Sequence, residues 1–206
     1  MKLLIATRNQ GKLKEMTALL DGLPVELATL REFPDAPEVA EDGATLEDNA
    51  TRKACQVARA CGLHVVADDS GLFVDALDGR PGVRSARYAG PDPTSEKLCA
   101  KLLSELVGVP QDARTAHFGC CIVMADPRGE AVLTARGRVD GRILTEMRGQ
   151  GGFGYDPVFF YQPAGCTFAE LAAPEKNDVS HRGRALREFR RAFEEYARTD
   201  PSRGRR

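Results

Sequence analysis

The sequence predicts an α/β fold built on a mixed β-sheet, and three observations carry that prediction. The chain begins with an apolar segment from Lys2 to Ala6, a polar turn, and a helix from Gly11 to Asp21 whose apolar side chains form one stripe. A buried strand begins at Val65, after a second helical segment. Two further apolar segments, Thr115–Ala125 and Ala131–Val139, flank a turn containing proline and glycine, which predicts a β-hairpin. Alternating strands and helices favour parallel pairing and a hairpin is antiparallel, so the sheet is expected to contain both.

Length, charge and cysteine usage limit the class of protein. We predict one domain over residues 1–198 and a basic, disordered tail at 199–206. With 29 basic and 30 acidic residues, the chain lacks the charge excess of general nucleic-acid or membrane binders. Its six cysteines form no C-x-x-C pair, which predicts reduced structural thiols and no structural zinc. No apolar run approaches the roughly 20 residues of a membrane span, so we expect a soluble, cytoplasmic protein.

The first turn has the composition of a phosphate-binding site. Backbone N–H groups, the start of a helix and the ammonium group of Lys12 are expected to converge there, which suits an anion. The segment nearly matches the P-loop pattern, but Ala6 replaces its first glycine and Leu13 replaces the Ser/Thr that ligates Mg²⁺. A surface turn with one lysine remains the alternative. If a metal is used, its ligands must lie elsewhere in the chain.

The pair Asp68-Asp69 is the obvious source of such ligands. The apolar strand from Val65 is expected to end on these two carboxylates, followed by Ser70 and a glycine. In open α/β sheets ligands bind at the carboxyl ends of strands, and carboxylates there can hold Mg²⁺ and orient a water against a phosphate. Because Asp, Ser and Gly also dominate ordinary turns, a polar turn is an equal alternative on this stretch alone.

The second helix is predicted from its start and stop signals. Thr45–Asp48 has the pattern of a capping box, and Gly62 is expected to end the helix. On it Asn49 and Lys53 share one face, which in most helices is simply solvated. Thr94 is expected to cap a third helix in the same way.

Two later segments contain further candidate site residues. The glycine-dense stretch Gly149–Pro157 would let its backbone approach a ligand closely, and the ring of Phe153 could stack on a base. The polar segment 175–182 is predicted to be a loop, after which Ser180 caps the final helix. A long loop at 78–93 is expected to be functional or to lie at an interface.

Taken together, these motifs resemble the ITP/XTP pyrophosphatases, a family that removes non-standard purine nucleoside triphosphates. The resemblance runs from Lys2 to about Ala197. Two positions depart from the family pattern: Arg8 stands where a small residue is common, and Leu46 where Phe is expected. The role of Arg8, as a phosphate contact or a solvent-exposed side chain, is therefore open. The motifs are Thr7–Lys12, Glu41 with Thr45 and Asn49-Ala50, Ala67–Leu72, Ser85–Tyr88, Gly151–Pro157, and Glu175-Lys176 with Ser180–Gly183.

The resemblance implies a fold, a reaction and an assembly. The fold is an elongated mixed β-sheet flanked by helices, with two lobes and the active cleft between them, usually in a homodimer. The reaction is Mg²⁺-dependent hydrolysis of ITP, dITP or XTP to the monophosphate and pyrophosphate. Such chemistry needs positioning and charge neutralisation more than covalent help, which lysines, N–H donors and carboxylates supply.

Matched residue by residue, the resemblance also implies roles for individual side chains. Asp69 is expected to accept the proton of the attacking water and, with Glu41 and Asp68, to hold the metal. Ser70 is expected to contact substrate. The triphosphate is expected to bind Thr7, Arg8, Asn9, Gln10, Gly11, Lys12 and Lys53. The base and sugar are expected to bind Phe153, Gly154, Tyr155, Asp156, Lys176, His181 and Arg182.

Two other classes of function are weighed against this one. A P-loop-like phosphotransferase is disfavoured by Ala6 and Leu13, which break the P-loop pattern. A nucleotide-binding module without catalysis is disfavoured because carboxylates with no metal repel a triphosphate.

Overall fold

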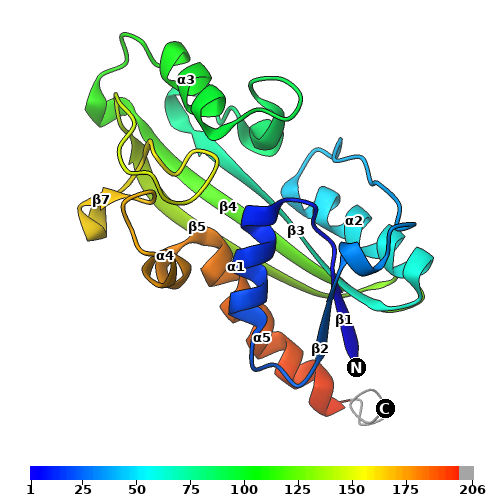
Figure 1. Ribbon diagram of the computed structural model, residues 1–206. Helices are drawn as coiled ribbons and strands as arrows, with labels where there is room; N and C mark the ends of the chain where they lie inside the picture. Colours follow the sequence, from blue (N-terminus) through cyan, green and yellow to red (C-terminus); the bar gives the residue numbers. More distant parts are fainter. Residues whose placement is uncertain (200–206) are drawn as a thin grey trace. The chain divides into compact units, whose positions relative to one another are not determined.

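The structure is a computed structural model that describes residues 1–199, and it contains one seven-stranded sheet flanked by helices (Figure 1). The strand order is β2-β1-β3-β4-β5-β6-β7. β1 pairs in parallel with β2 and β3, whereas β6 is antiparallel to β5 and β7, which confirms the predicted mixed sheet. Apart from residue 199, the predicted basic tail lies outside the described residues. The strands are β1 (Lys2–Ile5), β2 (Glu26–Thr29), β3 (His64–Val74), β4 (Thr115–Ala125), β5 (Ala131–Ile143), β6 (Phe159–Tyr161) and β7 (Cys166–Thr167).

Five α-helices accompany these strands in the described part of the chain. They are α1 (Gln10–Leu20), α2 (Leu46–Cys61), α3 (Ser95–Glu105), α4 (Ala173–Val179) and α5 (His181–Thr199). The chain forms two compact units. Unit 1 comprises Met1–Asp69, Cys120–Gly137 and the segment from Arg182, and unit 2 comprises Ser70–Gly119 and Arg138–His181.

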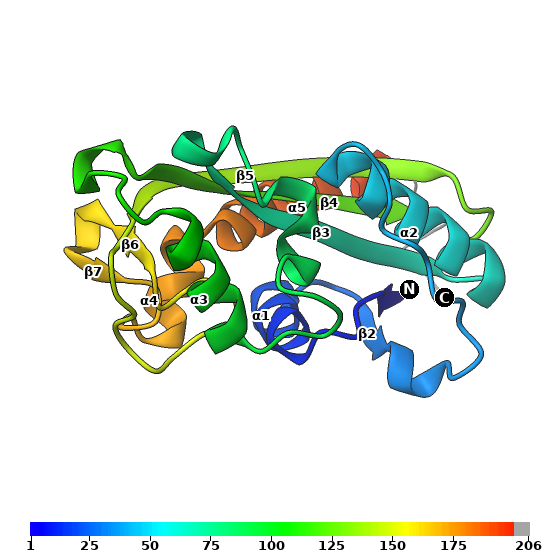
Figure 2. The same cartoon turned by 90° about the horizontal axis from the view of Figure 1, so that it is seen from above.

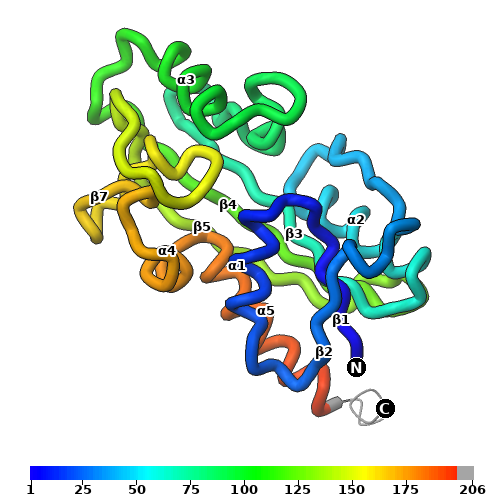
Figure 3. Tube along the Cα trace, in the orientation of Figure 1, coloured from blue at the N-terminus to red at the C-terminus, as the bar shows by residue number. Residues whose placement is uncertain are grey.

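In unit 1, side chains alternate along the strands and create two apolar faces. Leu3 and Ile5 belong to the face covered by α1 and α5, which lie side by side (Figures 1 and 3). Leu4 and Ala67 belong to the opposite face, which α2 covers (Figure 2). Consecutive residues of β3 therefore face different helices, and this alternation separates Asp68 from Asp69.

Helices α1 and α2 begin and end where the sequence predicts, to within one residue. The side chain of Asn9 caps α1 by accepting the N–H of Lys12. Thr45 and Asp48 exchange side-chain and backbone hydrogen bonds at the start of α2, which confirms the capping box. Gly62 ends α2 in the left-handed region at φ +65°, as glycine does at little steric cost.

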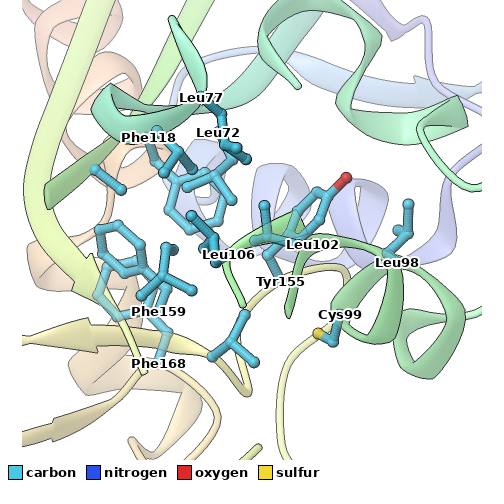
Figure 4. Close-up of a cluster of buried hydrophobic side chains, with 14 of the residues drawn as sticks. Leu72, Leu77, Leu98, Cys99, Leu102, Leu106, Phe118, Tyr155, Phe159 and Phe168 are labelled. Carbon is cyan, nitrogen blue, oxygen red and sulfur yellow. The ribbon is translucent and has the colours of Figure 1, made fainter. Parts of the chain in front are cut away.

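Unit 2 has a core of its own, part of which Figure 4 shows. The apolar side of α3 contributes Leu98 and Leu102, and the rings of Phe118, Phe159 and Phe168 pack against one another beside it. Thr94 caps α3 as predicted, by accepting the N–H of Lys97. The long loop at 78–93 contains a 3₁₀ helix, Gly82–Arg87, which approaches β3 from within this unit.

Three predicted boundaries were wrong. β5 ends at Ile143 and not at Val139, because its antiparallel pairing with β6 extends to that residue. β3 does not end on Asp68 and Asp69 but continues to Val74. Its parallel partner β1 is the strand that ends there: Ile5 pairs with Val66, and the chain then turns away, so the carboxylates lie beyond the end of β1. The segment predicted as a loop at 175–182 is mostly the short helix α4, which Glu175 caps by accepting the N–H of Ala172.

All six cysteines are free thiols, as the sequence predicts. Burial raises the pKa of the Cys120 and Cys121 thiols, the latter to about 11, so these buried thiols stay protonated at neutral pH. In residues 1–199, no helix is long and apolar enough to cross a bilayer.

Candidate active site

The turn between β1 and α1 has the features of an anion site. It starts α1 with Gln10, Gly11 and Lys12, so no acidic side chain occupies the first turn of the helix. Thr7 is buried and its hydroxyl accepts the N–H of Asn9, while Asn9 and Gln10 are exposed. The positive end of the helix dipole and the ammonium group of Lys12 therefore favour a negatively charged ligand here.

Asp68 lies at the centre of a buried ion network on the α1 and α5 side of β3. Its Oδ2 atom accepts hydrogen bonds from Nε and an Nη atom of Arg182, each at 3.1 Å, and lies 3.2 Å from Nζ of Lys12. Arg182 also donates to Glu15 of α1. Burial alone would raise the pKa of Asp68, but the charges of Lys12 and Arg182 outweigh it and hold the pKa well below its usual range. Asp68 is thus an anion at any physiological pH.

Asp69 faces the other way, toward α2. Its Oδ2 atom accepts a hydrogen bond of 2.8 Å from the side-chain amide of Asn49, which is fully buried. Burial raises the pKa of Asp69, and Lys12 offsets this only in part. The two neighbouring carboxylates therefore differ: one is held ionised by two cations, and the other has the raised pKa that suits a group accepting a proton.

A third carboxylate, Glu41, precedes α2 and forms an ion pair with Lys53 of that helix. Burial opposes the ionisation of Glu41, but Lys53 and, to a smaller extent, Lys12 together outweigh burial and lower the pKa of Glu41. The charges of Glu41 and Asp69 also influence each other, since Glu41 raises the pKa of Asp69. Lys12 and Lys53 thus place two positive charges among three carboxylates in unit 1.

These carboxylates have the donor chemistry of a magnesium site. Asp68 Oδ1 is buried and has no hydrogen-bond partner in the described structure, which leaves a hard oxygen donor unused. Among residues 1–199, however, no three Asp, Glu, His or Cys side chains converge closely enough to form a complete metal centre. Mg²⁺ typically uses one or two carboxylates and completes its shell with water and substrate phosphates, so the residues present fit that metal.

In unit 2 the predicted base-binding residues gather around Lys176. Nζ of Lys176 lies 2.5 Å from Asp156 Oδ2 and 4.7 Å from the centre of the Phe153 ring. The same Asp156 oxygen accepts the N–H of Phe153 at 2.8 Å. Gly152 precedes this ring at φ +70°, where a Cβ atom would collide with Asp156. One buried carboxylate therefore positions both the ring and the ammonium group.

The other predicted base-binding residues divide between the two units. His181 is buried in unit 2 and stacks on Phe118, with ring centres 4.6 Å apart. The hydroxyl of Tyr155 donates to the carbonyl of Ser85, so its polar end is turned into the core. Arg182 belongs to unit 1, where its guanidinium is almost fully buried with Asp68 and Glu15. Its role in base recognition stays a prediction.

The remaining predicted residues lie at the edges of these groups. Ser70 is half-buried and directly follows Asp69. The exposed side chain of Arg8 donates to the carbonyl of Ala36, and Arg31 donates to the side chain of Gln10. These two bonds connect the β1–α1 turn to the segment after β2.

Sequence reasoning left out two residues that contact the predicted machinery. Asn49 was part of a family motif, on a helix face that is usually solvated, and was given no role; it bonds Asp69, and its Oδ1 atom accepts the N–H of Gly43. Its place beside Ala50, on the edge of the apolar stripe, was the available signal. Glu15 lies one helical turn after Lys12, a spacing that puts the two on one side of α1.

Comparisons with known proteins agree with the fold, and several proteins similar to this chain are named as nucleotide pyrophosphatases. The model of the Ham1 family matches residues 3–192, so the chain belongs to the Ham1 family. A dITP/XTP pyrophosphatase of Geobacter sulfurreducens is 56% identical over 185 residues, covering 90% of this chain and 92% of the relative.

Solved structures give the same result. A HAM1 protein from Coxiella burnetii superposes with a TM-score of 0.86 at 38% identity, covering 95% of this chain and 99% of that one. A nucleoside-triphosphatase, dITP/XTP pyrophosphatase, from Mycobacterium abscessus superposes with a TM-score of 0.73 at 45% identity, covering 92% and 98% of the two chains. The family resemblance and the α/β fold class inferred from the sequence are confirmed.

Proposed function

We propose that this Ham1 protein hydrolyses ITP, dITP and XTP to the nucleoside monophosphate and pyrophosphate, and so removes non-canonical purines from the nucleotide pool. The observation that carries this proposal is the pair Asp68 and Asp69, two neighbouring carboxylates in opposite electrostatic environments, with Lys12 beside them. The names of the relatives support the same reaction.

In this mechanism the residues of unit 1 act on the triphosphate. The N–H groups of the β1–α1 turn, Lys12 and Lys53 bind the phosphate oxygens and neutralise their charge, which is most of what phosphoryl chemistry requires. Asp69 accepts a proton from the water that attacks phosphorus, and the bond joining the α-phosphate to pyrophosphate breaks. Asn49 orients the Asp69 carboxylate for that transfer.

We propose Mg²⁺ as the cofactor, with one or two of its protein ligands drawn from Asp69, Asp68 and Glu41 and the rest of its shell completed by water and substrate phosphates. When bound, it would neutralise the developing charge on the phosphates and on the pyrophosphate leaving group. The unused Oδ1 atom of Asp68 supports this assignment.

The residues that recognise the base lie between positions 153 and 182. Phe153 stacks on the purine, and Lys176, His181 and Arg182 are the candidate donors to its keto oxygen. Adenine presents an amino group there, which leaves a buried donor unpaired, and mismatches of this kind reject an analogue by up to about 10⁴–10⁵-fold.

We further propose that the enzyme works as a homodimer in the cytoplasm, on small-molecule substrates and without nucleic acid or membrane partners. Six free thiols suit a reducing compartment. Sedimentation at micromolar concentration tests the assembly, and a monomer there would remove the dimer from the proposal.

The test of the reaction is hydrolysis of ITP, XTP, ATP and GTP, with Mg²⁺ or with a chelator, resolving pyrophosphate from orthophosphate. We expect monophosphate and pyrophosphate from ITP and XTP, little product from ATP or GTP, and none with the chelator. Asp69→Asn should bind ITP and lose turnover by about 10²–10⁴-fold, the usual contribution of a general base. Asp140→Asn, at an exposed carboxylate, is the matched control. Orthophosphate as product, or full activity of Asp69→Asn, would refute the assignment.

A further inference from the structure

The 3₁₀ helix Gly82–Arg87 approaches β3 more closely than most side chains allow. A Cβ atom on Gly71 would collide with the carbonyl oxygen of Gly82 and would lie 3.2 Å from Ser85 Oγ. Glycine is therefore required at position 71 so that the two backbones can meet. This glycine directly follows Ser70, one of the predicted substrate contacts.

The hydroxyl of Ser85 fastens the 3₁₀ helix to the strand. Its Oγ atom accepts the N–H of Leu72 at 2.8 Å and donates to the carbonyl of Gly82 at 2.6 Å. Ser85 is only 7% exposed, so water cannot replace these partners. Removing the hydroxyl would leave a buried N–H group unsatisfied, which favours movement of the whole turn.

The backbone of Ser85 holds a second element, the glycine-rich loop. The hydroxyl of Tyr155 donates to the Ser85 carbonyl at 2.8 Å, and Tyr155 is 3% exposed. Figure 4 shows its ring among Leu98, Leu102 and Cys99 of α3. A tyrosine hydroxyl in an apolar core needs a partner, and here that partner belongs to the turn bonded to β3.

Tyr155 lies two residues after the ring that is proposed to stack on the base. Within that short stretch the N–H of Gly154 donates to Ser95 Oγ at 2.8 Å, and the N–H of Phe153 donates to Asp156 at 2.8 Å. The backbone that carries Phe153 is thus fixed from three directions: by α3, by Asp156, and by Ser85 through Tyr155.

We propose that Ser85 is a positioning residue for base recognition: through Tyr155 it sets the place of the Phe153 ring while it holds the strand segment that follows Ser70. This role rests on the proposed function, since it supposes that Phe153 stacks on a purine. Ser85 acts through its neighbours, so its loss should weaken recognition of the base and leave recognition of the phosphates unchanged.

The variant that isolates this effect is Tyr155→Phe, which keeps the ring and removes only the hydroxyl bonded to Ser85. We expect the KM for ITP to rise about fivefold to tenfold, the size of one neutral hydrogen bond, with kcat changed less than about twofold. The inhibition constant of tripolyphosphate, which has no base, should stay at the wild-type value. Tyr161→Phe, which removes a hydroxyl from the same core, is the matched control.

Ser85→Ala should shift the same parameters in the same direction. Both substitutions act on the same connection from β3 through Ser85 to Tyr155. The double variant should therefore have the KM for ITP of the single variant with the higher KM, and not the product of the two increases. If the inhibition constant of tripolyphosphate rises as much as the KM for ITP, the substitutions have loosened the whole site and the proposal is overturned. An unchanged KM for ITP in both single variants would also overturn it.

Hydrogen exchange of the peptide covering residues 150–157 separates failure of this inference from failure of the proposed function, because it needs no substrate. We expect faster exchange in Tyr155→Phe and Ser85→Ala than in the wild type or Tyr161→Phe. If wild-type protein hydrolyses neither ITP nor XTP, the proposed function fails while the exchange result still decides whether Ser85 anchors the loop. Unchanged exchange in both variants would overturn the anchoring role.

Discussion

The two groups of candidate site residues are built by different means. In unit 1, charged side chains project from β3, α1, α2 and α5. Each ion pair connects two of these elements, or connects a helix with the segment that precedes it. In unit 2, a loop carries the ring of Phe153, and hydrogen bonds to Asp156, Ser95 and Ser85 hold that loop in place. The first group depends on regular elements, and the second on polar anchors beneath an irregular segment.

Their electrostatics differ in the same way. Unit 1 places Lys12, Lys53 and Arg182 against Asp68 and Glu41, a set of charges suited to phosphates and a divalent cation. Unit 2 has a buried ion pair, Lys176 with Asp156, beside an aromatic ring, which suits a flat and nearly neutral base. We therefore propose that separate sets of residues recognise the charge and the shape of the substrate, and variants can test the two sets separately.

The largest effect on stability should come from the ion network of unit 1. Arg182→Met removes the guanidinium that bonds Asp68 and Glu15, and it leaves two carboxylates buried with one fewer cation. Breaking a buried pair in this way costs about 3–5 kcal/mol, which urea unfolding measures. Arg191→Met is the control, because its pair with Glu188 is exposed and such pairs contribute about 0–1 kcal/mol.

If Arg182→Met lowers the free energy of unfolding no more than Arg191→Met does, this ion network does not hold unit 1 together.

Much of the fold could be predicted because its signals are local. The caps at Thr45 and Thr94, the glycine at 62 and the turn between β4 and β5 each lie within a few residues of the element they define. The short helix α4 escaped prediction because its seven residues show no apolar stripe. The end of β1, which places Asp68 and Asp69 beyond its last pair, depends on sheet register that no local pattern gives.

The candidate site was predicted as a set of residues but not as a set of contacts. Arg182 and Asp68 are 114 positions apart, and Tyr155 and Ser85 are 70 apart. Neither pairing follows from spacing, since folding alone brings the partners together. Asn49 illustrates the same limit: an amide on a helix face is usually solvated, and its contact with Asp69 exists because β3 runs beneath α2.

One pair of variants tests whether charge and shape are recognised by separate residues. Phe153→Ala should raise the KM for ITP by about 5- to 150-fold, the equivalent of about 1–3 kcal/mol of stacking, and leave tripolyphosphate inhibition unchanged. Lys12→Met should weaken both, because both ligands carry the phosphates. Steady-state kinetics with tripolyphosphate as competitor measures the two constants. If Phe153→Ala weakens binding of ITP and of tripolyphosphate equally, the site residues of unit 1 and those of unit 2 do not act separately.

The smallest predicted effect concerns pH and sharpens the contrast between the two neighbouring carboxylates. Asn49 donates to the ionised form of Asp69 and so lowers its pKa, against the burial that raises it. Asn49→Leu removes the hydrogen bond that lowers the pKa of Asp69, while the burial that raises it remains. The pKa of Asp69 should therefore rise further. Because Asp69 must be ionised to accept a proton, the acidic limb of kcat/KM should move to higher pH while the alkaline plateau is largely kept.

Gln56→Leu is the control for this shift, since it makes the same kind of change at an exposed position of α2. Its acidic limb should coincide with that of the wild type. A limb that stays in place in Asn49→Leu, or moves to lower pH, would mean that Asp69 is not the group whose ionisation limits turnover. The base would then have to be sought elsewhere, and Asp68 is a poor candidate because Lys12 and Arg182 keep its pKa too low to retain a proton.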